Sequence, residues 1–570
     1  MEFEKILQDN WGYTSFRPLQ REIIESVCSG RDTVAILPTG GGKSITFQVP
    51  ALALDGLTIV VSPLVALMTD QVENLRRRGI RATVLHAGLR RDEILHQLEQ
   101  AEFGAYRLLY VSPERLTSPL FIKRLTFLNV KLIAVDEAHC VSEWGYDFRP
   151  TYLRIPELRS FFPEATMLAL TASSTPDVTA DIIDKLQMRQ PAMFRASVAR
   201  DNLIYVVRET RDRDVELMHI LRSVPGTAIV YTRSRANAEE VATMLAGNDF
   251  SASYYHAGLE AEERTRRQQR WMTGETRILC STNAFGMGID KPDVRLVVHY
   301  DIPDALEAYY QEAGRAGRDG HTAYAVALST PTTPDMVLRR HQRAFPPKEF
   351  IADVYQSLAN QYEVGVGSGE GATFAFHFEE FCHRWHYNYG AAQAALKVLE
   401  WSNLITVTEA MDDASKLKII MSPSEIFEWR MKNPADDRIL ETVMRLYTGI
   451  FTDPQHISET YIARACHITD TTKIYNYLIN LRRQGIVHYV PFKRTPLIIY
   501  NTARVDPDEL FIPRSAYENR IERMFQRLQA IHQYITTTDC RTTTLAHYFG
   551  ENDAFPCGIC DNCRAKQHSH

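Results

Sequence analysis

The sequence predicts an α/β protein with two parallel-sheet domains, followed by a winged-helix-like α+β region and a helical, cysteine-rich module. Three observations lead to this fold class. Short apolar runs alternate with polar helix-forming stretches, the alternation restarts after about residue 200, and four of the nine cysteines cluster near the C-terminus. Alternation of buried strands with helices is typical of a parallel sheet covered by helices on both faces.

Each of the two sheet domains is predicted from its apolar runs. In the first domain, residues 1–198, strands are expected at 33–37, 57–61, 107–111, 132–135 and 167–171. In the second domain, residues 199–335, strands are expected at 227–231, 251–255, 277–281 and 294–299. We expect the two domains to be of similar size and to join near residues 195–205.

The regular alternation of apolar runs and helix-forming stretches ends at about residue 335. Five glycine and serine residues crowd positions 365–371, which indicates a loop. Two similar units follow, each with a helix and then two apolar strands. The first unit is helix 391–401 with strands 403–407 and 416–420, and the second is helix 473–483 with strands 485–489 and 497–500. We expect at least the second unit of region 336–505 to be a winged helix, and the alternative is a generic helical packing domain.

Composition sets broad limits on the class of protein. The chain has 570 residues, 45% hydrophobic and 24% charged, which is a globular balance. It shows no basic-then-apolar leader and no apolar run near the roughly 18 to 20 residues of a membrane span. A cytoplasmic protein without membrane contact is expected. The net charge of −6 is unusual for a simple nucleic-acid binder, although a local basic channel can coexist with it.

A glycine-rich loop follows the first expected strand. Its residues are Thr39, Gly40, Gly41, Gly42, Lys43 and Ser44. Successive glycines let backbone N–H groups surround a polyphosphate, Lys43 supplies a cation for the β- and γ-phosphates, and Ser44 can ligate Mg²⁺. Position 37 is Leu where the strict phosphate-loop pattern has Gly, so the match is to a variant. A plain glycine-rich turn is the weaker reading, because Lys43 and Ser44 stand directly between a strand and a helix.

Two adjacent carboxylates end the strand at 132–135. Asp136 can hold Mg²⁺ directly or through water, and Glu137 can polarise the attacking water of a hydrolysis. A third polar segment, residues 311–320, lies in the second domain. Its Arg315 and Arg318 are three residues apart on one face, and one of them can reach a γ-phosphate as an arginine finger. ATP is therefore expected between the two sheet domains, with Gln311 as a further catalytic residue.

The C-terminal cysteines have metal-binding spacing. Cys540 is separated by sixteen residues from a Cys-x-x-Cys-x-x-Cys run formed by Cys557, Cys560 and Cys563. Four thiolates can close a tetrahedral structural zinc site, which makes His547, His568 and His570 unneeded as ligands. Zn²⁺ is expected here in preference to disulfides. The module, residues 506–570, is expected to begin with an amphipathic helix at about 514–536.

These segments occur in the order used by superfamily 2 helicases, and their finer details resemble the RecQ family over residues 1–330. The two sheet domains would then be RecA-like. Residues 11–20, Trp-Gly-Tyr-Thr-Ser-Phe-Arg-Pro-Leu-Gln, resemble the family's adenine-recognition motif. The resemblance implies that Tyr13 stacks on the base, Gln20 reads its edge and Arg17 supports the nucleotide. Asp290, in the matching segment 281–291, is also expected to bind nucleotide.

Residues 140–149, Cys-Val-Ser-Glu-Trp-Gly-Tyr-Asp-Phe-Arg, resemble the aromatic-rich loop of RecQ helicases. Unstacked bases can rest on the faces of Trp144 and Phe148, and Arg149 adds a cation. Because this segment follows Glu137, the resemblance implies that it passes strand occupancy to the hydrolysis site. His139 and Ser142 are expected to take part in this coupling.

The cysteine module departs from the family's order. Residues 540–550 resemble the RecQ zinc module, which in the family directly follows the helicase core and precedes the winged helix. Here about 200 residues intervene, so no strand-separating hairpin can be carried over. Because the local pattern is kept, we expect the module to pack against the core, with residues 335–505 as an excursion that leaves and returns.

The resulting prediction is an ATP-dependent DNA helicase that moves 3′ to 5′ along one strand and unwinds the duplex, with DNA repair or recombination as its setting. Its expected partners are single-stranded and duplex DNA, with ATP, Mg²⁺ and Zn²⁺ as cofactors. We expect a monomer in a bacterial-type cytoplasm, associated with the nucleoid. The alternatives are a superfamily 2 RNA helicase and a DNA-binding protein with a regulatory ATPase.

Overall fold

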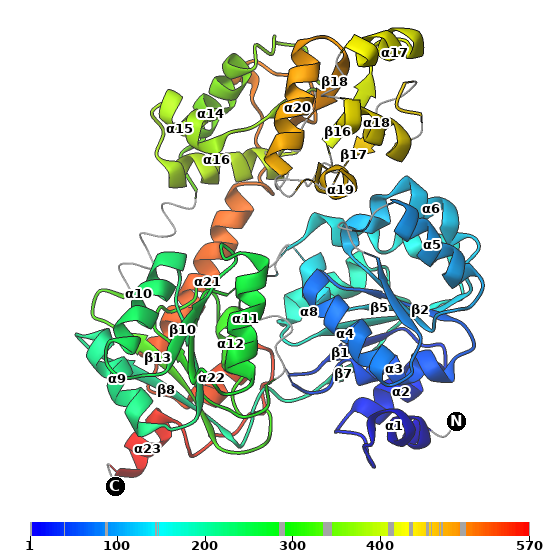
Figure 1. Ribbon diagram of the computed structural model, residues 1–570. Coiled ribbons are helices and arrows are strands. Elements are labelled where there is room, and N and C mark those ends of the chain that lie inside the picture. The colour runs from blue at the N-terminus through cyan, green and yellow to red at the C-terminus, as the bar shows by residue number, and fades with distance from the viewer. Residues whose placement is uncertain are drawn as a thin grey trace. The chain divides into compact units, whose positions relative to one another are not determined.

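The computed structural model describes residues 3–568 apart from 39, 86–88, 90, 143–144, 146–147, 284, 286–290, 334–344, 408–414, 433–436, 448, 452–454, 458, 467, 469–470 and 491–496. The chain forms two compact units (Figure 1). The first contains Met1–Arg339 together with Glu522–His570, and the second is Arg340–Ile521. Among the described residues, no helix is both long enough and apolar enough to cross a membrane.

The first domain is a parallel sheet of seven strands. Their order across the sheet is β3 (Ala82–Leu85), β4 (Leu108–Val111), β2 (Leu57–Val61), β5 (Val130–Val135), β6 (Thr166–Thr171), β1 (Thr33–Ile36) and β7 (Ala192–Arg195). The helices are α1 (Phe3–Trp11), α2 (Gln20–Cys28), α3 (Ile45–Ala53), α4 (Val65–Arg77), α5 (Arg91–Glu102), α6 (Pro119–Leu125), α7 (Glu157–Phe161) and α8 (Pro176–Lys185). The five predicted strands are present, and β3 and β7 are additional.

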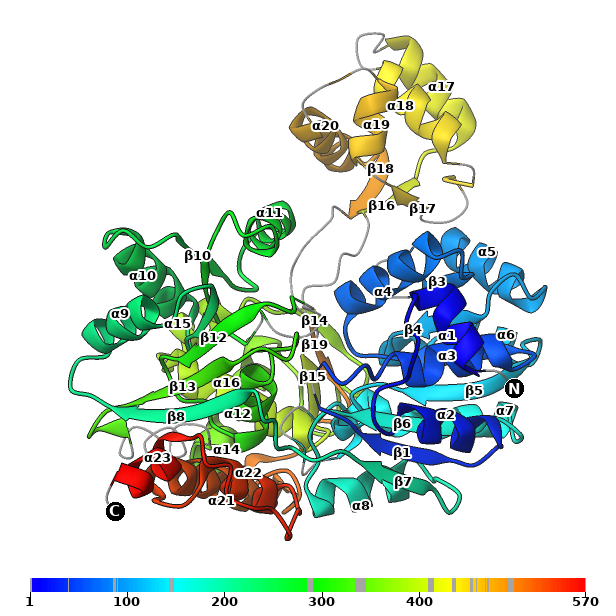
Figure 2. The same cartoon turned by 90° about the horizontal axis from the view of Figure 1, so that it is seen from below.

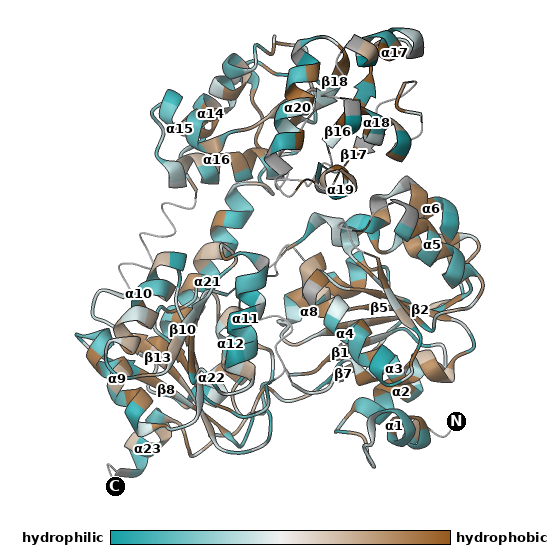
Figure 3. Cartoon of the chain, viewed as in Figure 1, coloured by the Kyte–Doolittle hydropathy of each residue, from teal (hydrophilic) through white to brown (hydrophobic). Residues whose placement is uncertain are grey.

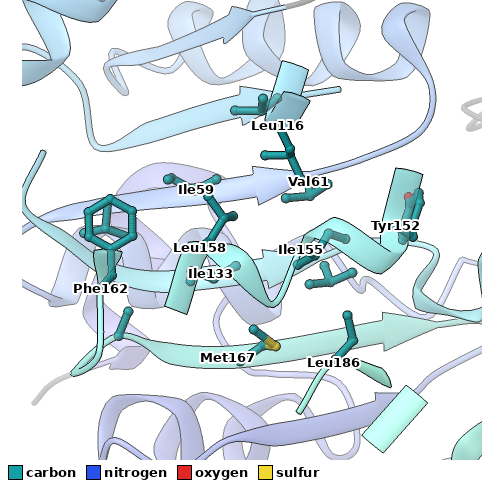
Figure 4. Packing of buried hydrophobic residues seen from close by; sticks show 14 of the residues in the cluster. Ile59, Val61, Leu116, Ile133, Tyr152, Ile155, Leu158, Phe162, Met167 and Leu186 are labelled. Carbon is teal, nitrogen blue, oxygen red and sulfur yellow. The ribbon is translucent and has the colours of Figure 1, made fainter. Parts of the chain in front are cut away.

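Both faces of this sheet are buried, which is why its strands read as continuous apolar runs. Along β2, Ile59 and Val61 face one core cluster and Val60 faces the other. Figure 4 shows the first cluster, where Leu158 of α7 and Phe162 close over Ile59 and Ile133. The strands appear brown and the outer helix faces largely teal in Figure 3. The packing fixes the carboxyl ends of the strands, where the polar segments lie.

The second domain is a parallel sheet of six strands. Their order is β10 (Ala252–Tyr255), β11 (Ile278–Ser281), β9 (Thr227–Tyr231), β12 (Val294–His299), β13 (Ala323–Ser329) and β8 (Leu203–Glu209). Its helices are α9 (Arg213–Ser223), α10 (Arg235–Ala246), α11 (Ala261–Met272) and α12 (Leu306–Ala313). The four predicted strands are present, and the structure adds β8 and β13, which pair with each other.

The cysteine module packs against the core, as predicted, and its contact is with the second sheet domain. It consists of α21 (Glu518–Thr536), α22 (Arg541–Tyr548) and α23 (Asp561–His568). Its apolar side chains Ile531, Tyr534, Leu545 and Phe549 belong to the same core cluster as the strands of that domain. Figure 2 shows these red helices beside α12 and β8. The long helix begins at 518 instead of about 514.

The second unit corrects the prediction for region 336–505. Strand β15 (Ile405–Val407) does not pair with β16 (Ser415–Ile419), as the two consecutive units required. It pairs instead with β19 (Leu497–Tyr500), which also pairs with β14 (Thr373–Ala375). Strand β16 lies between β17 (Gln455–Ile457) and β18 (Val487–Val490). The stretch of chain that forms the second of these sheets, β16 to β18, therefore lies in sequence between the strands of the first. We call it the inner body, and the flanking chain with β14, β15 and β19 the outer body.

The helices divide in the same way. The outer body contains α14 (Lys348–Gln361), α15 (Phe378–Arg384) and α16 (Tyr389–Trp401). The inner body contains α17 (Pro423–Lys432), α18 (Asp437–Leu446), α19 (Glu459–Ala465) and α20 (Thr471–Arg483). Each body has its own apolar cluster. The pairing prediction was wrong because it assumed that strands adjacent in sequence pair, which holds only about two-thirds of the time.

Candidate active site and metal centre

The glycine-rich loop connects the end of β1 to the start of α3. Gly40 and Gly42 have φ values of 81° and 75°, in the left-handed region that favours glycine. A side chain on Gly42 would collide with the Gln20 amide, and a Cβ on Gly41 would lie 2.9 Å from the Pro38 carbonyl oxygen. The following helix directs its N-terminus toward the loop, which favours an anion. Thr39 lies outside the described residues.

The predicted adenine-motif residues lie beside this loop. The Gln20 amide donates to the carbonyl oxygens of Gly42 at 3.0 Å and Gly41 at 3.3 Å, and its own oxygen accepts from the Arg17 N–H at 2.9 Å. The Arg17 guanidinium donates to the Gly40 carbonyl. Tyr13 is 55% exposed, so its ring is accessible. Two of the three residues thus hold the loop itself.

A chain of hydrogen bonds positions Ser44, one of the two predicted magnesium ligands. Gln71 donates to the Ser44 hydroxyl at 3.2 Å. The Tyr110 hydroxyl donates to Gln71 at 2.8 Å and accepts from Gln48 at 3.2 Å. Sequence reasoning assigned no role to Gln71. Lys43 precedes Ser44 and is half-buried.

Asp136 and Glu137 follow β5 at the carboxyl end of the first sheet. Asp136 accepts from the Ser62 hydroxyl at 3.4 Å and from the Glu137 N–H at 3.0 Å. Burial, together with the adjacent Glu137 carboxylate, raises the pKa of Asp136 to about 6, whereas Lys43 acts in the opposite direction. A divalent cation would favour the ionised form. The oxygen atoms of this carboxylate and of the Ser44 hydroxyl are of the kind that Mg²⁺ prefers as ligands.

His139 connects the acidic pair to the next strand. Its Nδ1 lies 3.4 Å from Glu137 Oε2 and 3.0 Å from the Thr171 hydroxyl at the end of β6. The Thr171 hydroxyl donates to the Ser173 carbonyl at 3.0 Å. Glu137 itself has a φ of 48°, and such backbone conformations cluster at functional sites. His139 thus links the water-activating candidate to the segment 171–174.

The two arginines of segment 311–320 have different surroundings. A Cβ placed on Gly40 would lie 3.0 Å from Cγ of Arg318, so Arg318 reaches the glycine-rich loop. Arg315 is buried beside Tyr231. Gln311 lies at the end of α12, two turns before Arg318. The geometry favours Arg318 over Arg315 as the residue that would face a bound triphosphate. Asp290 lies outside the described residues.

The aromatic segment is attached to the first sheet domain at several points. The Ser142 hydroxyl donates to Asp181 of α8 at 2.6 Å, and Arg149 donates to the Pro63 carbonyl at 3.4 Å. The Gly145 carbonyl accepts from Arg527 of the cysteine module at 2.8 Å. Phe148 is half-buried, and Trp144 lies outside the described residues. The segment is therefore held between the acidic pair and α21.

Replacing Phe148 with alanine is expected to weaken single-strand binding by about 1–3 kcal/mol, the usual contribution of a base stacked on an aromatic ring. Hydrolysis of ATP without DNA should persist while its stimulation by single strands falls, and Trp144→Ala should behave alike. The measurement is ATPase rate against DNA concentration. Phe127→Ala, at an exposed phenylalanine of the same domain, is the control. Equal loss of basal and stimulated rates would mean that the segment only supports the fold.

The four predicted zinc ligands converge. The sulfur atoms of Cys540, Cys557, Cys560 and Cys563 all lie within 4.8 Å of one another. Cys540 Sγ and Cys557 Sγ are 3.5 Å apart, near the roughly 3.8 Å that tetrahedral zinc with 2.3 Å bonds requires. Burial acts to raise the pKa of Cys540, but hydrogen bonds such as that from the Cys557 N–H outweigh it, so the pKa lies below its ordinary value. The cluster fits Zn²⁺.

Cys557→Ser is expected to remove bound zinc and to lower the melting temperature by roughly 5 °C or more, since 1 kcal/mol corresponds to about 2–4 °C in a domain of 150–250 residues. The physical reason is that the metal joins the helices that bury Tyr534 and Phe549. Metal analysis and calorimetry measure both effects. Cys28→Ser is the control, at an equally half-buried thiol outside the cluster. A purified wild-type chain without zinc would contradict the assignment.

Comparison with known protein families agrees with this order of segments. Residues 17–182 match the DEAD/DEAH box helicase family and residues 212–320 match the helicase conserved C-terminal domain. Residues 417–491 match the RecQ helicase winged-helix domain of Bacteroidota, and residues 505–564 match the RecQ zinc-binding family. The winged-helix match coincides with the inner body of the second unit.

Similar proteins carry related names. The chain is 39% identical over 367 residues to the probable ATP-dependent DNA helicase RecS of Bacillus subtilis (strain 168), covering 64% of this chain and 74% of that protein. It is 42% identical to the ATP-dependent DNA helicase RecQ of the same organism, covering 59% and 57%. The crystal structure of the DUF1998 helicase MrfA bound to DNA has a TM-score of 0.52 at 18% identity, covering 71% of this chain and 58% of that one. This last likeness concerns the fold alone.

Proposed function

Because this chain belongs to the RecQ family of superfamily 2 helicases, we propose that it is an ATP-dependent DNA helicase that translocates along one strand and unwinds duplex DNA. The observation that carries the proposal is the convergence of two segments at the glycine-rich loop. In the first sheet domain, the positive charge of Lys43 in the loop acts to lower the pKa of Asp136. From the second sheet domain, Arg318 approaches Gly40 of the same loop. Such an arrangement can couple hydrolysis to a change in the relative position of the two domains.

Each residue has a proposed role in the reaction. Lys43 and the loop N–H groups would bind the phosphates, and Mg²⁺ held by Ser44 and Asp136 would neutralise their charge. Glu137 would orient water for attack on the γ-phosphorus, while Arg318 would stabilise charge on the transferred group. Tyr13, Arg17 and Gln20 would bind the adenine side. Single-stranded DNA would bind to Phe148, Arg149 and Trp144. Through His139 and Ser142, this binding would change the position of Glu137 and so the rate of hydrolysis.

Finer features are also proposed. We infer movement in the 3′ to 5′ direction, action in DNA repair or recombination, and work as a monomer at the nucleoid, all from resemblance to the family. Gln311 and Asp290 are proposed to contact nucleotide, and Thr39 to complete the phosphate loop. The domain limits 1–198, 199–335, 336–505 and 506–570 are proposed working boundaries. The fit of the cysteine cluster supports Zn²⁺ as a structural metal.

Strand-displacement assays test the proposal. The substrates are duplexes with a 3′ tail, a 5′ tail, a fork or a four-way junction, each with and without ATP, and RNA duplexes in parallel. We expect ATP-dependent unwinding of the 3′-tailed DNA, and its loss in Lys43→Ala. Lys131→Ala, at an exposed lysine of the same domain, is the matched control. Unwinding of RNA alone, or none with any duplex, would overturn the proposal.

A further inference from the structure

Helix α12 determines where the arginine segment begins. It ends at Ala313, and Gly314, Arg315 and Arg318 follow without another intervening element. A shift of the helix along its axis would therefore carry Arg318 with it. Its Leu306, Tyr309, Tyr310 and Ala313 are buried in the core of the second sheet domain. What packs against this buried face thus fixes the helix.

The cysteine module supplies three contacts to that helix. The Tyr548 hydroxyl donates to Glu307 Oε1 at 2.9 Å, and the Tyr534 hydroxyl donates to the Tyr309 hydroxyl at 3.1 Å. The ring of Phe549 lies 5.1 Å from that of Tyr310, inclined by 52°. These contacts fall on the first two turns of α12. They come from two different helices of the module and the residue that follows one of them.

Loss of the hydrogen bond to Glu307 would be costly, because the Glu307 side chain is buried. Glu307 is only 5% exposed, and its second oxygen has no hydrogen-bond partner among the described residues. A buried carboxylate is costly unless it is paired. Burial, together with the Glu307 carboxylate itself, raises the pKa of Tyr548, so this hydroxyl stays protonated and donates. Removing it would leave the carboxylate unpaired and favour displacement of α12.

The helices that carry these two tyrosines are tied to the cysteine cluster. Arg541, which follows Cys540, donates to the Tyr534 carbonyl and lies 3.0 Å from Asp561. Asp561 follows Cys560 and also accepts from the Val207 N–H of β8 at 2.9 Å. The cluster, the two tyrosines and the edge strand of the sheet are therefore one connected structure.

We propose that the cysteine module sets the position of α12 and, through it, of Arg318, with Tyr548 and Tyr534 as positioning residues for ATP hydrolysis. This inference rests on the proposed function, because it assigns Arg318 to the hydrolysis site. It adds a role for the module in the chemical step, in addition to stabilising the end of the chain. Neither tyrosine would touch nucleotide; each would act through the helix.

The test uses the full-length chain with Tyr548→Phe and Tyr534→Phe, each of which removes one hydroxyl and keeps the ring. We expect the turnover number for ATP to fall by about tenfold, within the 10²-fold that a 1 Å misplacement can cause. The affinity for a fluorescent ATP analogue and the zinc content should stay at wild-type values. Tyr205→Phe is the matched control, because this buried tyrosine of the same core has a hydroxyl without a hydrogen-bond partner among the described residues.

A double variant separates positioning from mere stabilisation. If Tyr548 acts through Arg318, then Tyr548→Phe combined with Arg318→Ala should turn over no more slowly than Arg318→Ala alone. A further tenfold loss in the double variant, or a loss equal to that of Tyr205→Phe, would overturn the inference. Lys43→Ala distinguishes the two proposals: hydrolysis that survives it contradicts the function itself, whereas wild-type turnover in Tyr548→Phe contradicts only the positioning role.

Discussion

Replacing Arg318 with alanine is expected to lower ATP turnover by about 10³-fold or more, the range in which loss of an arginine finger falls. Arg318 approaches Gly40, whereas Arg315 is buried beside Tyr231. Binding of ATP should change little, because in the proposed site the phosphates would be held by the loop and Lys43. The measurements are steady-state ATPase with saturating single-stranded DNA and equilibrium binding of a fluorescent analogue.

Two further variants sharpen this test. Arg318→Lys keeps the charge but loses the planar fork, so it should recover only part of the rate. Arg270→Ala, at an exposed ion pair with Glu275 in the same domain, is the control and should turn over normally. Unchanged turnover in Arg318→Ala would move the finger role to Arg315 or to another residue.

The parallel sheets could be predicted because burial on both faces leaves a strong signal in sequence. The run Leu57–Val61, for example, has four apolar residues and one threonine, and all five are buried. Strands β3, β7 and β8, each at an edge of its sheet, were missed, and so was β13, which is buried inside its sheet. Edge strands bury only part of their surface, so apolar pattern alone does not reveal them.

The nested second unit could not be predicted in the same way. Strands of three to five residues carry too little information to specify their partners. In each of its two sheets the central strand pairs with a strand from the other end of that body's chain: β19 pairs with β14 and β15, and β16 pairs with β18. Long-range pairing of this kind leaves no local pattern. Docking of the cysteine module was predictable because its local pattern matched a known family.

Some residues of the candidate site could be predicted from the sequence, and others could not. Residue types and spacing predicted Lys43, Asp136 and the four cysteines, since phosphate binding and metal ligation each require specific groups, and the structure brings the four cysteines together. Sequence reasoning gave no role to Gln71, whose amide can be assigned only from its contact with Ser44. Nor could it separate Arg318 from Arg315 by position, because both lie on one face, and the structure distinguishes them by burial and by the approach of Arg318 to Gly40.

Glu137→Gln is expected to abolish unwinding while ATP stays bound. Glutamine keeps the shape of the side chain but cannot accept the proton of the attacking water, so hydrolysis should fall by about 10²–10⁴-fold. The phosphate loop, Lys43 and Ser44 are unchanged, so the nucleotide should dissociate slowly in its unhydrolysed form. Single-turnover hydrolysis, followed by recovery of bound nucleotide by gel filtration, measures both quantities.

Lys43→Ala should also lose unwinding, but for another reason: without the Lys43 ammonium group the loop should bind the phosphates weakly. In Lys43→Ala little nucleotide should be recovered, whereas in Glu137→Gln the recovered nucleotide should be ATP. Glu164→Gln, at an exposed glutamate of the same domain, should behave like the wild type. Normal single-turnover hydrolysis by Glu137→Gln would show that another group activates the water. His139 would then be the next candidate, since its Nδ1 lies 3.4 Å from the Glu137 carboxylate and 3.0 Å from the Thr171 hydroxyl.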